Sequence, residues 1–327
     1  MKALVYTGVE SLDYRDVSDP VEGADSLIKV EAVGICGSDM HAYLGHDERR
    51  PAPLILGHEA SGLVIEGPMQ GKRVTVNPLV TCGTCPACLE GRTNICPNRQ
   101  IISMPPREGG FAELLSMPAG NLIEIPDRFS TTDAALAEPI AVCWHAVRLA
   151  EAALYGEMSD ARCLVIGGGA IGVGSALSLR AFGATDVTVV EANPDRAAFV
   201  AERCDFATVT PADVPENGFE LIIDAVGYRA TRAAACAAVR PGGVITHIGL
   251  GDANDGLDIR RLTLQEIIFF GTYTYTAQDF RDTAQAMFGG RLGDLNWIEE
   301  RGLADGAAAF ADLRAGKVHA PKIVLHP

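Results

Sequence analysis

A run of glycines between an apolar strand and an alanine-rich helix constrains the fold of this chain more than any other feature. The segment from Gly167 to Gly172, GGGAIG, has the pattern G-x-G-x-x-G. Residues 163–166 are typical of a buried strand, and residues 173–182 of a helix. Gly167 then permits a tight turn, Gly169 lets a pyrophosphate approach the backbone, and Gly172 lets helix and strand pack closely. The pattern predicts a dinucleotide site at the amino end of the helix.

Strands and helices alternate regularly through the second half of the chain. This alternation predicts right-handed βαβ units and a parallel, doubly wound sheet of the Rossmann type, so the fold class is α/β. Helices are expected over 139–154, 279–288 and 303–315. The expected strands lie at 163–166, 187–191, 221–225, 244–249 and 267–272, with a final strand at 322–325.

The first part of the chain, up to about residue 135, has a different texture. Short β-rich pieces at 27–33, 60–65 and 73–76 are separated by clusters of Gly, Pro and Asp. Such clusters are typical of turns between strands. We therefore expect a mostly β domain here, with its functional residues on loops.

Glu191 ends the strand that follows the glycine pattern, about 20 residues on, where dinucleotide folds bind the adenosine ribose. A carboxylate there accepts hydrogen bonds from both ribose hydroxyls and repels a 2′-phosphate. The sequence therefore predicts NAD rather than NADP as the cofactor. Arg196 follows closely, and it either contacts the adenine or a phosphate or is a solvated helix residue.

Four cysteines are the second strong signal. Cys82, Cys85, Cys88 and Cys96 have the spacing Cys-x2-Cys-x2-Cys-x7-Cys in a polar stretch rich in Gly and Pro. Four thiolates this close together suit a closed tetrahedral zinc site. Four further cysteines lie in apolar patterns and are expected to be ordinary buried thiols: Cys143, Cys163, Cys204 and Cys236.

A second set of metal ligands precedes the cysteine lobe. Cys36, His58 and Glu59 offer a thiolate, an imidazole and a carboxylate, and Glu138 opens the helix where the texture of the chain changes. Three protein ligands with one position left for water or substrate define a catalytic zinc site. Five other histidines are expected to be surface or core residues: His46, His145, His247, His319 and His326.

Composition argues against several classes of function. The net charge of −15, from 42 acidic and 27 basic residues, argues against nucleic acid as a partner. The sequence has no run of about 18 apolar residues, so no membrane span is expected. Residues 1–6 are typical of a strand rather than of a signal peptide. We therefore expect a cytoplasmic protein.

The chain resembles the zinc-dependent medium-chain dehydrogenase/reductase family over essentially its whole length. The matching segments, in the family's order, are GICGSDMH, GHE, the four-cysteine lobe, AEP and GGGAIG. The resemblance implies a GroES-like catalytic domain made of residues 1–139 and 276–327, with a structural zinc lobe at about 82–96. It also implies a Rossmann NAD-binding domain at 140–275, with the active site in the cleft between the two domains.

For the catalytic zinc, the resemblance implies Cys36 and His58 as ligands. Glu59 and Glu138 would take the remaining protein positions, or Glu138 would reach zinc through water. The cysteine lobe would hold the second zinc of the chain. Besides the glycines, the NAD site would be lined by Ile171, Glu191, Arg196, Ile248, Gly249, Leu250, Thr272 and Tyr273.

The implied reaction is oxidation of a secondary alcohol to a ketone, with Ser38 and His41 as the proton relay. Simple alcohol dehydrogenases of the family usually carry Cys where this chain has Glu138, so the resemblance favours the polyol and sugar branch. The expected substrates are, in order, polyols, sugar acids, L-threonine and simple secondary alcohols. The loop 103–110 is expected to shape the substrate pocket. Arg99 and Arg107 either meet a carboxylate or phosphate, or are solvated.

The family further suggests a homodimer or homotetramer, joined through the strand near 267–275. Three other interpretations are weaker. Glu191 and the Cys36, His58 and Glu59 set oppose a zinc-free, NADPH-dependent reductase of the same fold. The acidic charge opposes a zinc-ribbon protein that binds nucleic acid or protein. A homologue that has lost catalysis is disfavoured because every expected chemical residue is present.

Overall fold

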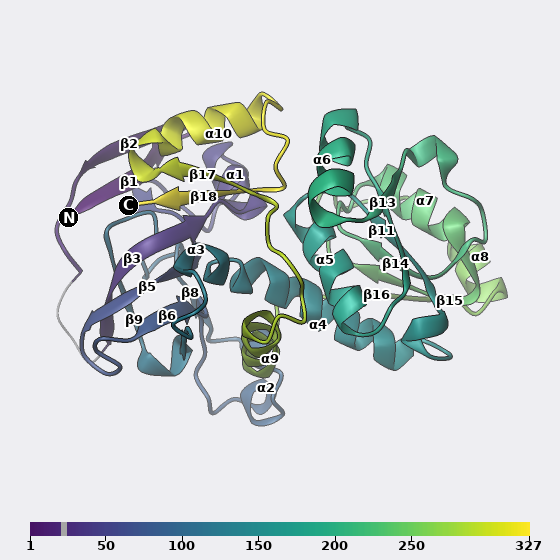
Figure 1. Cartoon of the computed structure of the whole chain (residues 1–327), viewed down its shortest axis with the longest axis horizontal. Helices are drawn as coiled ribbons and strands as arrows, with labels where there is room; N and C mark the ends of the chain where they lie inside the picture. The colour runs from purple at the N-terminus through teal and green to yellow at the C-terminus, as the bar shows by residue number, and fades with distance from the viewer. Residues whose placement is uncertain (21–24) are drawn as a thin grey trace.

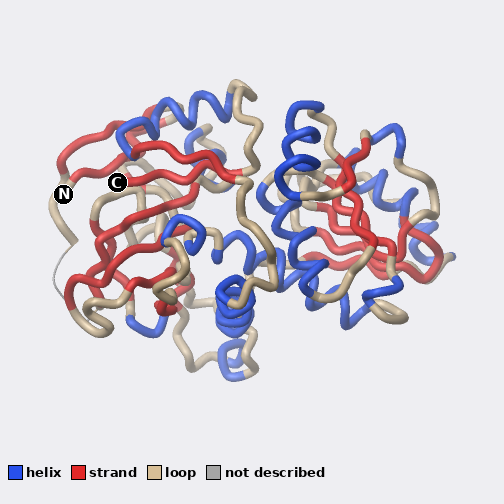
Figure 2. The backbone as a smooth tube through the Cα atoms, viewed as in Figure 1, coloured by secondary structure: helices blue, strands red, loops and turns tan. Residues whose placement is uncertain are grey.

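The computed structural model describes residues 1–20 and 25–327. Two groups of strands lie side by side, and helix α4 (Ala137–Ala153) runs between them (Figure 1). The amino-terminal strands and the last strands of the chain form one group, and the middle of the chain forms the other (Figure 2). None of the described helices is both long and apolar enough to cross a membrane.

The first group is a mixed sheet that both ends of the chain build together. Its strand order is β10-β6-β5-β3-β18-β17, with β9 also pairing with β3. Strand β18 runs antiparallel to β3, which brings the end of the chain back to its beginning. The bounds are β3 Ser26–Gly34, β5 Glu59–Glu66, β6 Arg73–Val76, β9 Leu114–Met117, β10 Leu122–Glu124, β17 Ile298–Gly302 and β18 Lys322–His326.

Two smaller sheets flank this mixed sheet. One has the order β2-β1-β4, and the other pairs β7 with β8 next to the four cysteines. Helix α10 (Gly306–Arg314) packs over β2 and β17. The bounds are β1 Lys2–Gly8, β2 Ser11–Asp16, β4 Leu54–Ile55, β7 Leu79–Val80 and β8 Gln100–Ile101.

The second group is the predicted parallel sheet. Its six strands have the order β13-β12-β11-β14-β15-β16, and every pairing is parallel. The prediction of a doubly wound Rossmann sheet is therefore confirmed. The bounds are β11 Arg162–Ile166, β12 Asp186–Val190, β13 Ala207–Val209, β14 Phe219–Asp224, β15 Val239–His247 and β16 Ile268–Gly271.

One strand differs from its prediction by several residues. Strand β15 was expected over 244–249 but runs over Val239–His247. Its first half contains Pro241, Gly242 and Gly243, a sequence typical of a turn, and the register against β14 shifts there. The turn-forming residues sit in an irregularity of the strand rather than before it, which the sequence pattern cannot distinguish.

The helices lie close to their predicted positions. Helix α4 begins at Ala137 and α5 at Ala170. The segment predicted as helix over 303–315 is a short 3-10 helix, Leu303–Asp305, followed by α10. The remaining helices are α1 Gly37–Tyr43, α2 Pro86–Leu89, α3 Thr131–Ala134, α5 Ala170–Ala181, α6 Pro194–Cys204, α7 Arg229–Ala238, α8 Ile259–Leu264 and α9 Ala277–Phe288.

Helix α4 packs against both groups of strands, and it is therefore buried along most of its length. It contacts α5 and β15 on one side and β5 and α9 on the other. A network around the carboxylate of Asp279 holds α9 against it. His145 Nδ1 lies 2.8 Å from Asp279 Oδ2, and Arg148 Nε donates to Asp279 Oδ1 at 2.6 Å. The same carboxylate accepts the backbone N–H of Thr276, the N-cap of α9, at 3.0 Å. His145 is thus a core residue, as expected.

Replacement of Asp279 should destabilise the protein more than loss of an ordinary surface charge. Asp279→Ala leaves His145 without its partner and removes a helix cap, so we expect a loss of about 3 kcal/mol in the free energy of unfolding. Denaturant unfolding monitored by circular dichroism measures it. Asp195→Asn, which changes an exposed first-turn carboxylate of α6, is the control. Equal losses in the two variants would contradict the role of the network.

The same carboxylate should make stability depend on pH. Burial raises the pKa of Asp279, but its hydrogen bonds with His145, Arg148 and Thr276 outweigh burial and hold the pKa well below its usual value. Such a group adds stability above its unfolded-state pKa of about 3.9, and this stability is lost as the pH falls through the folded-state pKa. Between about pH 5 and pH 3, the wild type should therefore lose more stability than Asp279→Asn.

Candidate active site

Three potential zinc ligands from two segments meet at one end of β5. Cys36 precedes α1, His58 directly precedes β5, and Glu59 is the first residue of that strand. One ligand atom from each of the three lies within 4.8 Å of the others. Cys36 is half-buried, whereas His58 and Glu59 are buried. The structure therefore brings together the thiolate, imidazole and carboxylate that the sequence pointed to.

A second layer of groups orients His58. Its Nδ1 lies 3.4 Å from Asp39 Oδ1 and 3.4 Å from Ser103 Oγ. Asp39 is fully buried, and its other oxygen accepts the backbone N–H of Cys36 at 3.0 Å. Groups of this kind fix the ring orientation and tautomer of a metal-binding histidine. Burial lowers the pKa of His58, but Asp39 and Cys36 together raise it well above its usual value. The negative charges of Asp39 and Cys36 thus make this position favourable for a cation.

Glu59 lies between a cation and the other two ligands. Its Oε1 accepts from Lys322 Nζ at 2.6 Å, and both side chains are buried. Lys322 also donates to the carbonyl oxygen of Ile35 at 2.9 Å. Glu59 Oε2 is buried and has no hydrogen-bond partner among the described residues. A side chain at Gly34 would overlap this carboxylate, so glycine makes room for it.

The donor set fits zinc. A buried carboxylate oxygen without a partner is costly unless something binds it. Here that oxygen belongs to a side chain grouped with a sulfur and a nitrogen donor, and sulfur, imidazole nitrogen and carboxylate oxygen are the ligand types of catalytic zinc.

Glu138 lies near this cluster but has a different partner. It sits in the first turn of α4 and is 6% exposed. The Tyr275 hydroxyl donates to Glu138 Oε1 at 2.7 Å. The three-ligand cluster does not include Glu138. Burial raises the pKa of Glu138 to about 7, with His58 lowering it and Glu59 raising it, which places Glu138 within electrostatic range of both.

The two predicted relay residues lie on one short helix, α1. Ser38 is half-buried, and its hydroxyl accepts from Arg50 Nη2 at 3.3 Å. His41 is exposed, with its ring centroid 6.4 Å from that of His46. Residues three apart share a helix face, so the pair leads from the half-buried end of α1 toward the surface.

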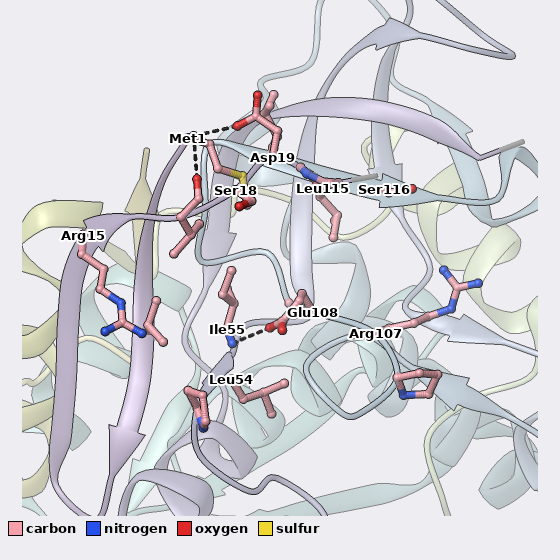
Figure 3. Close-up of a pocket in the computed structure, with 17 residues that line it drawn as sticks. Met1, Arg15, Ser18, Asp19, Leu54, Ile55, Arg107, Glu108, Leu115 and Ser116 are labelled. Atoms are coloured by element: carbon pink, nitrogen blue, oxygen red, sulfur yellow. Dashed lines mark hydrogen bonds and ion pairs between the residues drawn. The ribbon is translucent and has the colours of Figure 1, made fainter. Parts of the chain in front are cut away.

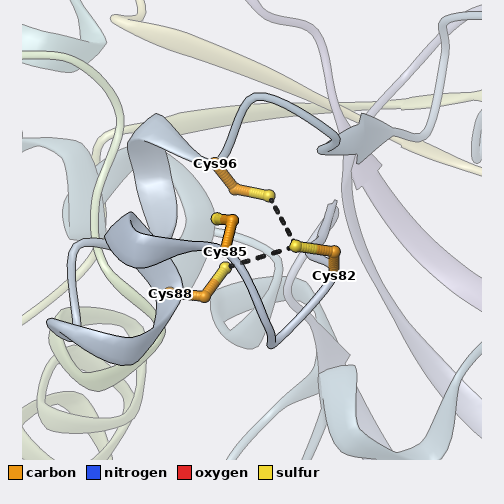
Figure 4. Close-up of side chains that lie close together, drawn as sticks. All are labelled: Cys82, Cys85, Cys88 and Cys96. Carbon is orange, nitrogen blue, oxygen red and sulfur yellow. Dashed lines mark hydrogen bonds between the residues drawn. The ribbon is translucent and has the colours of Figure 1, made fainter.

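The four cysteines of the lobe converge as predicted (Figure 4). Cys82 Sγ lies 4.0 Å from Cys88 Sγ and 3.5 Å from Cys96 Sγ. Four sulfurs bonded to zinc at about 2.3 Å would lie about 3.8 Å apart, so this spacing fits a tetrahedral zinc site. Backbone N–H groups of Thr84 and Cys85 and the Cys96 thiol lower the pKa of Cys82 to about 5. The four cysteines that follow the lobe, Cys143, Cys163, Cys204 and Cys236, are buried, as expected.

The cysteine lobe also contacts the segment that links β16 to α9. Asn94 Nδ2 donates to the carbonyl oxygen of Tyr273 at 2.8 Å, and Thr93 Oγ1 accepts from the backbone N–H of Ala277 at 2.8 Å. The guanidinium of Arg99 lies over the Tyr273 ring, 5.0 Å from its centroid. Arg99 is therefore a packed residue rather than a solvated one. Tyr273, predicted to line the NAD site, carries these contacts to the lobe.

The glycine turn has the shape that a dinucleotide site requires. Gly167 has φ +105°, a conformation that favours glycine. A side chain at Gly172 would overlap the carbonyl oxygen of Gly167. A side chain at Gly169 would meet no described atom within 4 Å, so this glycine faces open space where a pyrophosphate would approach the amino end of α5.

Glu191 stands directly after β12, beside this turn. Its Oε2 accepts from the backbone N–H of Gly168 at 2.9 Å, and its Oε1 from that of Asn193 at 2.8 Å. Arg196 is half-buried, and its Nη2 donates to the carbonyl oxygen of Val318 at 3.1 Å. The guanidinium thus contacts the chain near β18 and is not a freely solvated side chain.

The other residues predicted to line the NAD site are spread along the carboxyl ends of the strands. The backbone N–H groups of Ile248 and Gly249 donate to Asp224 O at 2.9 and 3.1 Å. Leu250 is 80% exposed. Thr272 donates its backbone N–H to the carbonyl oxygen of His247 at 3.0 Å. Ile171 lies half-buried in the first turn of α5.

The loop 103–110 has two faces. Ser103, at its start, contacts His58, whereas residues 106–109 line a pocket of about 560 Å³ together with Met1 and Ile55 (Figure 3). None of the candidate zinc ligands lines that pocket. Arg107 is half-buried and donates to Gln100 Oε1 at 2.8 Å and to Asp25 Oδ2 at 3.2 Å. This arginine is therefore already paired within the protein.

Sequence reasoning missed five residues of the site. Asp39, Arg50, Ser103, Tyr275 and Lys322 contact predicted site residues but were not predicted to do so. A charge opening an otherwise apolar strand was a usable signal for Lys322, and Asp39 stands inside the GICGSDMH segment. The other three carry no local signal, because their roles depend on contacts distant in sequence.

Comparisons with known families match both halves of the chain. The alcohol dehydrogenase GroES-like domain matches residues 22–127. The zinc-binding dehydrogenase domain matches residues 170–289. The first match contains Cys36, His58, Glu59 and the cysteine lobe. The second begins inside the glycine turn, at Ala170, and contains Gly172 and Glu191.

Comparisons with individual proteins agree. L-galactonate-5-dehydrogenase of Escherichia coli K12 is 32% identical over 309 residues, covering 89% of this chain and 88% of that protein. Sorbitol dehydrogenase of Bacillus subtilis is 32% identical over 84% of this chain and 82% of its own. A putative zinc-binding dehydrogenase from Sinorhizobium meliloti, solved bound to NADP, superposes with a TM-score of 0.89 at 27% identity, covering 100% and 99% of the two chains.

Proposed function

The chain belongs to the zinc-dependent medium-chain dehydrogenase/reductase family, and on that premise we propose that it oxidises a secondary alcohol of a polyol or sugar acid to the ketone, with NAD as the acceptor. One observation carries the proposal: Glu59 Oε2 is buried and has no partner among the described residues, and the Glu59 side chain belongs to the cluster formed with Cys36 and His58. This arrangement is suited to a zinc ion with a position left for substrate.

In the proposed site, Cys36, His58 and Glu59 hold the zinc. Zinc bound there would lower the pKa of a substrate hydroxyl. NAD would take a hydride from the carbon that carries this hydroxyl, giving ketone, NADH and one proton. We place Glu138 behind a water rather than directly on the metal, because its carboxylate is bound by Tyr275 and lies outside the three-ligand cluster.

The proton leaves along α1 in this proposal. Ser38 accepts it at the half-buried end of the helix, and His41, one turn further on, is exposed to solvent. Asp39, between them in sequence, points the other way and holds the His58 ring. One short helix thus separates the group that orients a metal ligand from the groups that move the proton.

NAD is the proposed cofactor, bound by the turn from Gly167 to Gly172. Glu191 already accepts from the N–H of Gly168, and its charge disfavours a 2′-phosphate. We propose that Arg196, Ile171, Ile248, Gly249, Leu250, Thr272 and Tyr273 line the remainder of the cofactor site. Arg196 and Tyr273 would do so beside the contacts that they already make with Val318 and Asn94.

The second proposed zinc is held by Cys82, Cys85, Cys88 and Cys96, whose sulfur spacing suits it. We propose domain boundaries at 1–139 with 276–327, and at 140–275. The pairing of β18 with β3 supports assigning the last residues to the first domain. The names of the relatives support a polyol or sugar acid as substrate, ahead of L-threonine or a simple secondary alcohol.

A panel assay tests the proposed reaction. NAD reduction should be seen with at least one polyol or sugar acid, and it should disappear after treatment with a chelator. Cys36→Ser should abolish turnover and lower the zinc content from two ions per chain to one, while NADH binding survives. Wild-type activity in Cys36→Ser would show that the zinc assignment is wrong. Activity with NADPH alone, unaffected by chelation, would favour a zinc-free reductase.

Replacement of Glu191 tests the cofactor. Glu191→Ser removes the charge that would face a 2′-phosphate, so kcat/KM with NADP should rise relative to that with NAD by at least about tenfold. Glu202→Ser, on the exposed side of α6, is the control and should leave the ratio unchanged. A wild type that prefers NADP would contradict the proposed role of Glu191.

We also propose a homodimer or homotetramer. Strand β16 pairs with β15 alone among the described strands, and Ile268 on it is 43% exposed, so an edge of the sheet is available to a second copy. Size-exclusion chromatography with light scattering should give at least twice the chain mass of 34.5 kDa. Ile268→Lys should shift the protein toward the monomer, and a wild type that already elutes as a monomer would refute the proposal.

A further inference from the structure

A buried arginine lies behind the candidate zinc site and has no role in the reaction described so far. Arg50 is 3% exposed. Its guanidinium donates to Ser103 O at 3.1 Å, to Ser38 O at 3.2 Å, to Ser38 Oγ at 3.3 Å and to Asp47 Oδ2 at 2.7 Å. One side chain thus joins the helix α1, the turn after it and the loop 103–110.

We propose that Arg50 is a positioning residue that fixes two parts of the active site at once: the Ser38 hydroxyl and, through Ser103, the His58 ring. The inference rests on the proposed function for the role of Ser38. Its other half, the support of His58, concerns metal binding and can be measured without turnover.

The Ser103 side of this clamp is held in an unusual backbone conformation. Ser103 is fully buried and has φ +68°, a left-handed value that a residue other than glycine keeps only where its surroundings enforce it. Arg50 Nε donates to the carbonyl oxygen of Ser103, while the Ser103 hydroxyl lies 3.4 Å from His58 Nδ1. Loss of the Arg50 contact would free Ser103 to relax and withdraw its hydroxyl from the ring.

On the other side of the clamp, Arg50 orients the hydroxyl group of Ser38. Arg50 binds both the carbonyl oxygen and the Oγ of Ser38, so the side chain has a fixed rotamer. A guanidinium only donates hydrogen bonds. One lone pair of Ser38 Oγ is therefore taken by Arg50, and the other remains to receive a proton from substrate.

Lysine cannot replace Arg50 in this arrangement. The contacts diverge from a planar group with separate N–H donors on Nε, Nη1 and Nη2, whereas lysine carries a single ammonium. Arg50→Lys keeps the charge next to Asp47 but cannot span Ser103 and Ser38. A role limited to the charge pair would therefore survive the change to lysine, and a positioning role would not.

The neighbouring arginine is a matched control. Arg49 donates to both oxygens of Asp47, from Nε to Oδ1 at 2.8 Å and from Nη2 to Oδ2 at 2.9 Å, but its side chain is 62% exposed. Among the described residues, Arg49 has no hydrogen bond with Ser38, Ser103 or His58. Arg49→Gln therefore removes a charge from the same aspartate without touching the clamp.

The experiment compares Arg50→Lys, Ser103→Ala and Arg49→Gln in the zinc-loaded full chain. The first readout is the rate at which a chelator removes the zinc ion from the site of Cys36, His58 and Glu59. Cys36→Ser, which lacks this ion, identifies its share of the total release. We expect it to rise about 10-fold to 100-fold in Arg50→Lys and Ser103→Ala. The second readout is turnover. Only Arg50→Lys should combine a lower kcat with a larger solvent deuterium isotope effect, at an unchanged KM for NAD. Arg49→Gln should match the wild type in both.

Three results would overturn the proposal. One is a folded Arg50→Lys, judged by its melting temperature, with wild-type zinc release and wild-type kcat. Another is equal behaviour of Arg50→Lys and Arg49→Gln. The third applies if Arg50→Lys fails to fold: it is a rate of zinc release in Ser103→Ala equal to that of the wild type. A wild type that oxidises no alcohol would refute the proposed function instead, and zinc release would still decide the support of His58.

Discussion

The buried ion pair between Glu59 and Lys322 is the interaction on which the site depends. It joins the first residue of β5 to the first residue of β18, and it leaves the second oxygen of Glu59 without a hydrogen-bond partner among the described residues, in a side chain grouped with Cys36 and His58. A buried carboxylate and a buried ammonium each need the other. The return of the last strand onto β3 therefore sets both the shape of the mixed sheet and the charge of the candidate zinc site.

Contacts between helix α4 and the segment after β16 hold a second part of the structure together. Tyr275 in that segment binds Glu138 at the start of α4, and Asp279 just beyond it binds His145 further along the same helix. The cysteine lobe contacts the segment from the other side through Thr93 and Asn94. The four-cysteine lobe, the helix that packs against the parallel sheet and the carboxylate of Glu138 thus meet at one short stretch of chain.

The sequence predicted the parts of this protein that repeat or that have fixed spacing. The parallel sheet, the glycine turn, the four-cysteine lobe and the Cys36, His58 and Glu59 cluster all follow from local pattern. The sequence could not predict the long-range side-chain contacts that support those parts. Lys322 reaches Glu59 across most of the chain, and Arg50 meets Ser103 only because a loop folds back. Contacts of this kind are determined by tertiary packing and leave no periodic trace in the sequence.

The pairing of Glu59 with Lys322 has a consequence for synthesis of the protein. The two residues are 263 positions apart, and the whole nucleotide-binding sheet lies between them. At translation rates of about 5–20 residues per second, Glu59 emerges roughly 10–50 s before its lysine exists. During that interval the first sheet lacks strand β18, which pairs with β3, and the Glu59 carboxylate lacks its lysine. The candidate zinc site is therefore completed late, after the strands of the parallel sheet have already been made.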